Sequence, residues 1–113
     1  MAQHALGNVT PASTTTALRA TNNQTTPASN YPCQALQFQA LGTNTGSVYI
    51  VDRQTPDLTQ NVLAEIPAPG SSPVTRPAWV IGNPAAPAPF DAATFWILPA
   101  VSGEGVRVTA VKT

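Results

Sequence analysis

Residues 36–51 read Leu-Gln-Phe-Gln-Ala-Leu-Gly-Thr-Asn-Thr-Gly-Ser-Val-Tyr-Ile-Val. The first five alternate between apolar and polar side chains, which puts Leu36, Phe38 and Ala40 on one face of a strand. Residues 41–46 form a turn signal, with two glycines and an asparagine. Residues 47–52 are rich in the β-branched and aromatic side chains that favour strands. This stretch predicts a β-hairpin, the clearest one in the chain.

A second pair of strands is expected near the C-terminus. Residues 94–98, Thr-Phe-Trp-Ile-Leu, have strand composition and are followed by Pro99. Residues 106–111 alternate again, and the Ser-Gly-Glu-Gly sequence at 102–105 is typical of a tight turn. We therefore predict a closing hairpin.

The middle of the chain is rich in proline. Residues 60–66 indicate a third strand, or a short helix, that ends at Pro67. Seven prolines follow between 67 and 89, and proline lacks the N–H needed inside a sheet, so loops and edge segments are expected. Residues 79–81 remain a candidate short strand. About six or seven short strands with intervening loops indicate an all-β fold, an antiparallel β-sandwich of jelly-roll type over residues 31–113.

The first thirty residues differ in composition from the rest. They are rich in Thr, Ser, Asn, Gln and Ala, contain no aromatic residue, and carry Arg19 as their one charged side chain. Such a segment buries too little apolar surface to fold alone. We expect residues 1–30 to form an extended N-terminal arm, either disordered or ordered by a sheet edge or a neighbouring subunit, with residues 13–19 able to donate one strand.

Length and charge limit the function. A chain of 113 residues has room for one domain. Only 9% of its residues are charged, against about 25% in typical domains, and the net charge is zero, which argues against nucleic acid or an anionic membrane as a partner. No apolar run approaches the roughly 20 residues of a membrane span, and the N-terminus lacks the features of a secretory signal. We expect a soluble chain made in the cytoplasm, with much of its surface covered by other proteins.

Few residues are suited to catalysis. His4 is the single histidine and Cys33 the single cysteine, so a Cys-cluster metal site and an internal disulfide are excluded. The acids lie at strand ends, in turns or on polar strand faces, where solvation or capping is expected, and Asp91 looks like a turn or cap residue. Cys33 is expected to pack as a small apolar residue. We predict no enzymatic activity, no cofactor and no metal; a hydrolase using His4 or an acid pair such as Asp52 and Asp57 is the remote alternative.

The aromatic residues are the better candidates for a site. Tyr49 and Trp96 lie on the strand face opposite the predicted core, where a loop or another subunit must cover them. Trp79 and Phe90 lie in the proline-rich region, where few strands are available to bury them. We therefore predict a protein interface formed from six residues: Leu18, Arg19, Tyr49, Trp79, Phe90 and Trp96. A carbohydrate platform built on Tyr49, Trp79 or Trp96 is an alternative.

Four blocks of sequence carry a resemblance to a known class of proteins. They are residues 36–50 of the predicted hairpin, the Ile-Pro-Ala-Pro-Gly sequence at 66–70, Phe-Asp-Ala-Ala-Thr-Phe-Trp-Ile at 90–97, and Ser-Gly-Glu-Gly-Val-Arg-Val at 102–108. Their order resembles the small β-sandwich virion proteins of tailed bacteriophages. Val51-Asp52 departs from the pattern, since such chains often carry a glycine after the hairpin strand.

The resemblance implies a structural role in a virus particle. Proteins of this class are capsid decoration or cement proteins, head-fibre bases, or connector-associated proteins. It implies that this chain is located in the virion, binds the major capsid protein or other virion proteins, and forms a homo-oligomer, expected to be a trimer. A position in the connector, tail or fibre base is the alternative to decoration, and the resemblance adds no catalytic residue.

Overall fold

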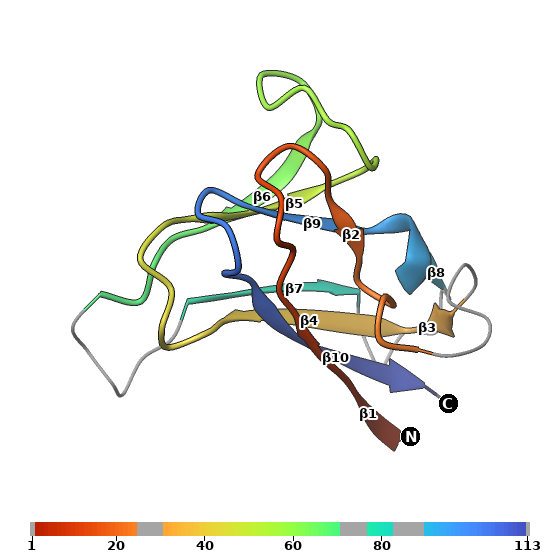
Figure 1. The fold of residues 1–113 in the computed structure, drawn as a ribbon. Helices are drawn as coiled ribbons and strands as arrows, with labels where there is room; N and C mark the ends of the chain where they lie inside the picture. Colours follow the sequence, from red (N-terminus) through yellow and green to blue (C-terminus); the bar gives the residue numbers. More distant parts are fainter. Residues whose placement is uncertain (1, 25–30, 71–76, 83–89, 113) are drawn as a thin grey trace.

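The computed structural model describes residues 2–24, 31–70, 77–82 and 90–112 (Figure 1). These residues form an all-β fold of antiparallel sheets, with one 3-10 turn. The elements in chain order are β1 (Ala2–Val9), β2 (Leu18–Arg19), β3 (Pro32–Cys33), β4 (Ala35–Ala40), β5 (Val48–Val51), β6 (Val62–Ile66), β7 (Ala78–Gly82), β8 (Phe90–Asp91), η1 (Ala92–Thr94), β9 (Trp96–Pro99) and β10 (Val106–Lys112).

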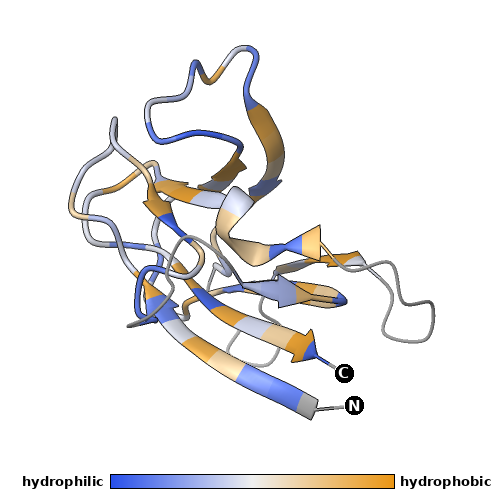
Figure 2. Cartoon of the chain, turned by 90° about the vertical axis from the view of Figure 1, so that its right-hand side faces the viewer, coloured by the Kyte–Doolittle hydropathy of each residue, from blue (hydrophilic) through white to orange (hydrophobic). Residues whose placement is uncertain are grey.

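The strands form two four-stranded sheets and one short pair. One sheet has the order β1-β10-β4-β7, the other has the order β2-β9-β5-β6, and β3 pairs with β8. In the view of Figure 1, the β2-β9-β5-β6 sheet lies above the β1-β10-β4-β7 sheet. Hydropathy alternates along several strands (Figure 2), because successive side chains point to opposite faces of each sheet.

The strand pairs are nested. With the two-residue β3 and β8 set aside, the first strand pairs with the last (β1 with β10), the second with the last but one (β2 with β9), β4 with β7, and β5 with β6. The chain is thus one long antiparallel hairpin that turns back at residues 52–61. Winding this hairpin on itself adds two further pairings, β10 with β4 and β5 with β9.

Both hairpins predicted from the sequence are wrong. The strands were located close to their true positions, but β4 and β5 lie in different sheets, and so do β9 and β10. The glycine-containing turns at 41–47 and 100–105 carry the chain from one sheet to the other. Phe38 and Ile50 are therefore on the inner faces of separate sheets, both fully buried in one core.

The two crossing loops are joined to each other. Asn44 is buried, and its Nδ2 donates to the Gly105 carbonyl at 2.7 Å while its Oδ1 accepts from the Gly105 N–H at 3.3 Å. The Glu104 carboxylate accepts from the Thr45 N–H and hydroxyl, each at 2.8 Å, and from the Gly46 N–H at 3.0 Å. These bonds satisfy backbone groups that lie outside either sheet.

An aromatic cluster occupies the core between the sheets. Phe38 on β4 stacks on Trp79 of β7 at a centroid distance of 5.8 Å, and Phe95 lies 6.0 Å from Phe38. Phe90 packs edge-on against Phe95 at 5.8 Å. Aliphatic side chains of both sheets fill the rest of the core, among them Leu6, Val9, Leu36, Val48, Ile50, Ile66, Ile97, Val106 and Val108.

The N-terminal segment contributes to both sheets. β1 pairs along its length with β10, and Leu6 and Val9 are 1% exposed within the main core. Of the strand suggested for residues 13–19, only Leu18–Arg19 forms, as β2. The strand at 2–9 was not predicted. Residues 25–30 of the expected arm, and prolines 73, 84, 87 and 89 of the proline-rich stretch, lie outside the described residues.

The remaining strand predictions are confirmed. β6 begins at Val62 and ends at Ile66, directly before Pro67, and forms a strand rather than a helix. β7 contains the predicted residues 79–81.

Candidate interaction surface

The outer face of the β2-β9-β5-β6 sheet carries a second, smaller apolar cluster. Strand register places Trp96 between Arg19 and Val51, and Leu98 opposite Tyr49. Val51 and Leu98 are buried there together with Ala17, and Tyr49, Trp96 and Val62 pack around them half-buried. The sequence placed Tyr49 and Trp96 on this face, and the structure confirms it.

Arg19 and Trp96 form the most specific contact of this face. The guanidinium carbon of Arg19 lies 4.7 Å from the centroid of the Trp96 ring, a distance at which the cation is attracted by the π-system. The Nε of Arg19 is buried and has no hydrogen-bond partner within the described residues. A stacked Arg–Trp pair combines a large apolar area with a positive charge, and both residue types are enriched at protein-binding hot spots.

A hollow of about 200 Å³ adjoins this pair. Ala17, directly before β2, is joined to the 52–61 turn here, because its N–H donates to the Gln54 carbonyl at 2.7 Å. The lining combines apolar surface, two amide side chains and the guanidinium, and consists of Ala17, Leu18, Arg19, Asn22, Gln54 and Trp96. Such a site can hold a side chain or a small polar group against the indole ring.

The structure brings together only part of the predicted interface. Arg19 and Trp96 are in contact, and Tyr49 lies in the neighbouring row of the same face. The Leu18 side chain packs against the main core, and Leu18 is also among the residues that line the hollow.

Trp79 and Phe90 are placed differently from the prediction. Few strands were expected to be available to bury them, but β7 carries Trp79 onto Phe38, and Phe90 packs against Phe95. Both rings are half-buried at the margin of the aromatic core. Phe38, the partner of Trp79, lies on a strand distant in the sequence, so local composition gave no signal of that contact.

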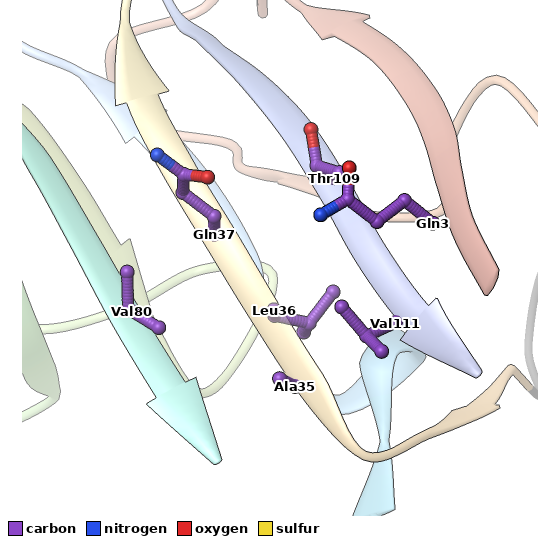
Figure 3. A pocket seen from close by; sticks show the side chains of 7 residues that line it. All are labelled: Gln3, Ala35, Leu36, Gln37, Val80, Thr109 and Val111. Carbon is purple, nitrogen blue, oxygen red and sulfur yellow. The ribbon is translucent and has the colours of Figure 1, made fainter. Parts of the chain in front are cut away.

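The other sheet has a smaller hollow on its outer face (Figure 3). It has a volume of about 140 Å³ and extends across all four strands, lined by Gln3, Ala35, Leu36, Gln37, Val80, Thr109 and Val111. Its polar groups are amides and a hydroxyl. Sequence reasoning did not single out this face, since glutamines on a strand are typical of any solvated surface.

None of the groups weighed for catalysis is among the residues that line these two hollows. His4 is exposed on β1, and Asp52 forms an exposed ion pair with Arg53 at 2.8 Å. Asp57 accepts from the Thr59 N–H and hydroxyl, as a turn residue does. Among the described residues, no three His, Cys, Asp or Glu side chains come together as a potential metal site.

Cys33 and Asp91 behave as the sequence indicated. Cys33 is 2% exposed in the main core, and burial, followed by the nearby charge of Asp91, raises the pKa of its thiol to about 11. The thiolate, which is the nucleophilic form, is therefore disfavoured. The Asp91 Oδ1 accepts from the N–H groups of Tyr31 at 2.7 Å and Ala93 at 2.9 Å, and caps η1.

Within the part of the chain that the structure describes, no helix has the length and apolarity to cross a bilayer. Comparison with protein-family models, with curated proteins and with solved structures finds no match to this chain.

Proposed function

We propose that the two sheets form a jelly-roll sandwich and that the protein is a structural component of a bacteriophage particle. The nested pairing β1–β10, β2–β9, β4–β7 and β5–β6 supports the jelly-roll assignment. It is the strand order of a long hairpin wound into two facing sheets of four strands, an architecture common in viral capsid proteins and lectins.

The role that fits best is capsid decoration or cement, in which the protein stabilises the outer capsid lattice by protein–protein contacts. The observation that carries this proposal is the Arg19–Trp96 pair with its adjoining hollow on an outer sheet face. A half-buried tryptophan stacked with a guanidinium is suited to anchoring a partner chain. The low charge of the whole chain, 9%, favours a surface covered by neighbours over one kept apart by charge.

The partner would be the major capsid protein or another virion protein. Tyr49 and Trp96 would supply apolar contact area, and Arg19 would supply donors to a carbonyl or carboxylate of the partner. The electrostatics favour such a partner over nucleic acid, since the net charge is zero.

A binding assay with a matched control tests the proposal. Purified chain is mixed with phage heads that lack it, and the bound fraction is measured by co-sedimentation. Trp96→Ala and Arg19→Ala should each weaken binding at least about tenfold, as expected of a hot spot worth about 1.4 kcal/mol or more. Val101→Ala, at a side chain 41% exposed in another loop, should bind like the wild type. Absence of the wild-type chain from heads, or equal binding of all variants, would reject the proposal.

Copy number separates decoration from the alternative within the same particle. A count in purified particles near that of the major shell protein supports a lattice component. A few copies per particle would place the protein in the connector, tail or fibre base.

The hollow beside Trp96 also favours a second candidate, a carbohydrate-binding module. Asn22 and Gln54 supply amide groups there, next to an indole ring, and sugars are bound by this combination of stacking and hydrogen bonding. The Arg19 guanidinium already covers part of that ring, which is why we rank this function second. Binding on a glycan array that is lost in Trp96→Ala would support it, and an array without signal would remove it.

A further inference from the structure

The four edges of the two large sheets are protected to different degrees. Natural edge strands avoid pairing with other chains by being short, charged or bulged. β2 has two residues, one of them Arg19. β6 carries Glu65 and meets a register shift in its pairing with β5. β1 has a register shift between Ala5 and Gly7, and such a bulge twists an edge away from a flat approach.

β7 has none of these protections among the described residues. It runs from Ala78 to Gly82 with the sequence Ala-Trp-Val-Ile-Gly, which has no charge and no proline. Its pairing with β4 proceeds without a register shift. No described strand pairs with its other side, since β7 ends the order β1-β10-β4-β7.

The alternation of hydrogen-bonded residue pairs between β4 and β7 shows which backbone groups of β7 point away from β4. The Ala40 N–H donates to the Pro77 carbonyl at 2.8 Å, which extends the register by one pair beyond Gln39 and Ala78. Hydrogen-bonded and non-hydrogen-bonded pairs alternate along antiparallel strands. Trp79 and Ile81 are therefore bonded to β4, whereas the N–H and C=O groups of Ala78 and Val80 point away from it.

The side chains agree with an open edge. Val80 is 59% exposed, the largest value among the exposed large hydrophobic residues of the described chain. It lies on the outer face of the sheet beside Gln37 of β4 (Figure 3). The flanking residues on that face, Ala78 and Gly82, are small, so a neighbouring strand meets no bulky group.

In place of the trimer that the sequence resemblance implies, we propose that β7 is the contact between two copies of this chain, paired antiparallel across a two-fold axis at Val80. In this arrangement Val80 is opposite the partner's Val80, and each donates its outward N–H to the other's carbonyl. A two-fold axis sets every residue near its own equivalent, so a charged edge would place like charges together. The uncharged β7 has no such penalty, and β-branched side chains opposite each other stabilise a sheet.

This proposal does not depend on the proposed function and is tested on the isolated chain. Sedimentation velocity over a dilution series should show a monomer–dimer equilibrium. Val80→Lys adds an edge charge, and Val80→Pro removes the outward N–H without taking a donor from β4; both should weaken dimerisation at least about tenfold. Val80→Thr keeps the β-branched shape and the N–H, and should still dimerise. Circular dichroism of the dilute variants checks that each one folds.

Amide hydrogen exchange gives a second readout on the wild-type chain. The amides of Trp79 and Ile81, bonded to β4, should be protected at all concentrations. The amide of Val80 should gain protection only as the concentration rises into the dimer range. A wild-type chain that remains monomeric, a trimer in place of the dimer, or a dimer unaffected by both Val80→Lys and Val80→Pro would overturn the proposal.

Discussion

At the scale of single residues, Glu104 has the most sharply defined electrostatic environment. The Gly46 N–H, together with the N–H and hydroxyl of Thr45, hydrogen-bonds the charged carboxylate and lowers its pKa below the ordinary value of 4.5. A carboxyl whose pKa is lower in the folded state stabilises that state above the unfolded pKa. This stabilisation is lost as the pH falls through the folded value.

The first prediction is that the effect of Glu104→Gln depends on pH. At pH 7 the variant should have a smaller free energy of unfolding than the wild type, because an amide is a weaker acceptor than a carboxylate. Below about pH 4.5 the difference should shrink and disappear as the wild-type carboxyl is protonated. Urea denaturation at a series of pH values measures this difference in the free energy of unfolding.

Glu65→Gln is the matched control for this series. The Glu65 carboxylate accepts from the Ser47 hydroxyl on an exposed strand, without backbone donors among its described contacts. The Glu65→Gln variant should differ less from the wild type in its free energy of unfolding at pH 7 than Glu104→Gln does. A Glu104→Gln difference that persists unchanged at pH 3 would mean that the loop connection does not depend on the charge.

Part of the candidate surface could be predicted from the order of residue types in the sequence. Tyr49 and Trp96 could be placed outside the core because they alternate with Ile50 and Ile97, which are buried. The contact of Arg19 with Trp96 could not be predicted, because it depends on the pairing of β2 with β9, strands close together in space and distant in sequence.

At the scale of strands, alternation specifies the face of a residue but not the partner of its strand. Residues 36–40 and 106–111 were correctly located, because apolar and polar side chains alternate along most of each segment. The turn at 41–47 resembles a hairpin loop in composition, yet Gly and Asn also suit a loop that crosses between sheets. Pairing is a long-range property, and it was assigned incorrectly for that reason.

β1 was missed because its sequence, Ala-Gln-His-Ala-Leu-Gly-Asn-Val, is poor in β-branched residues. It forms a strand because β10 offers an edge and because Leu6 and Val9 reach the core.

The second prediction follows from this burial. Leu6→Ala should lower the free energy of unfolding by about 2–5 kcal/mol, as for other fully buried leucines. Gln3→Ala, at an exposed residue of the same strand, should change it by less than about 0.5 kcal/mol. Thermal or urea denaturation measures both. A neutral Leu6→Ala would indicate that β1 folds as an arm independent of the core.

At the scale of the whole molecule, one core connects the two large sheets. Phe38 from one sheet and Phe95, which directly precedes β9 of the other, have their ring centroids 6.0 Å apart. Neither sheet can bury its inner face without the other. A single cooperative unfolding transition is therefore expected.

The third prediction tests this cooperativity. Phe38→Ala should lower the free energy of unfolding by about 3–5 kcal/mol, because it removes the central ring of the aromatic cluster. The near-ultraviolet and far-ultraviolet circular dichroism signals should shift to the same lower midpoint. Two separated transitions in the variant would show instead that the sheets unfold independently.

The nested winding also determines how the chain can be rearranged or joined to other proteins. Ala2 is the register partner of Lys112, so the first and last described strands run side by side to the same margin of the molecule (Figure 1). Anything attached ahead of β1 and after β10 leaves from one place. A short linker between these two points would close the backbone into a circle, and the 52–61 turn would then be a natural place to open new termini. The same fold would thus become a circular permutant or a scaffold that displays two fused segments next to each other.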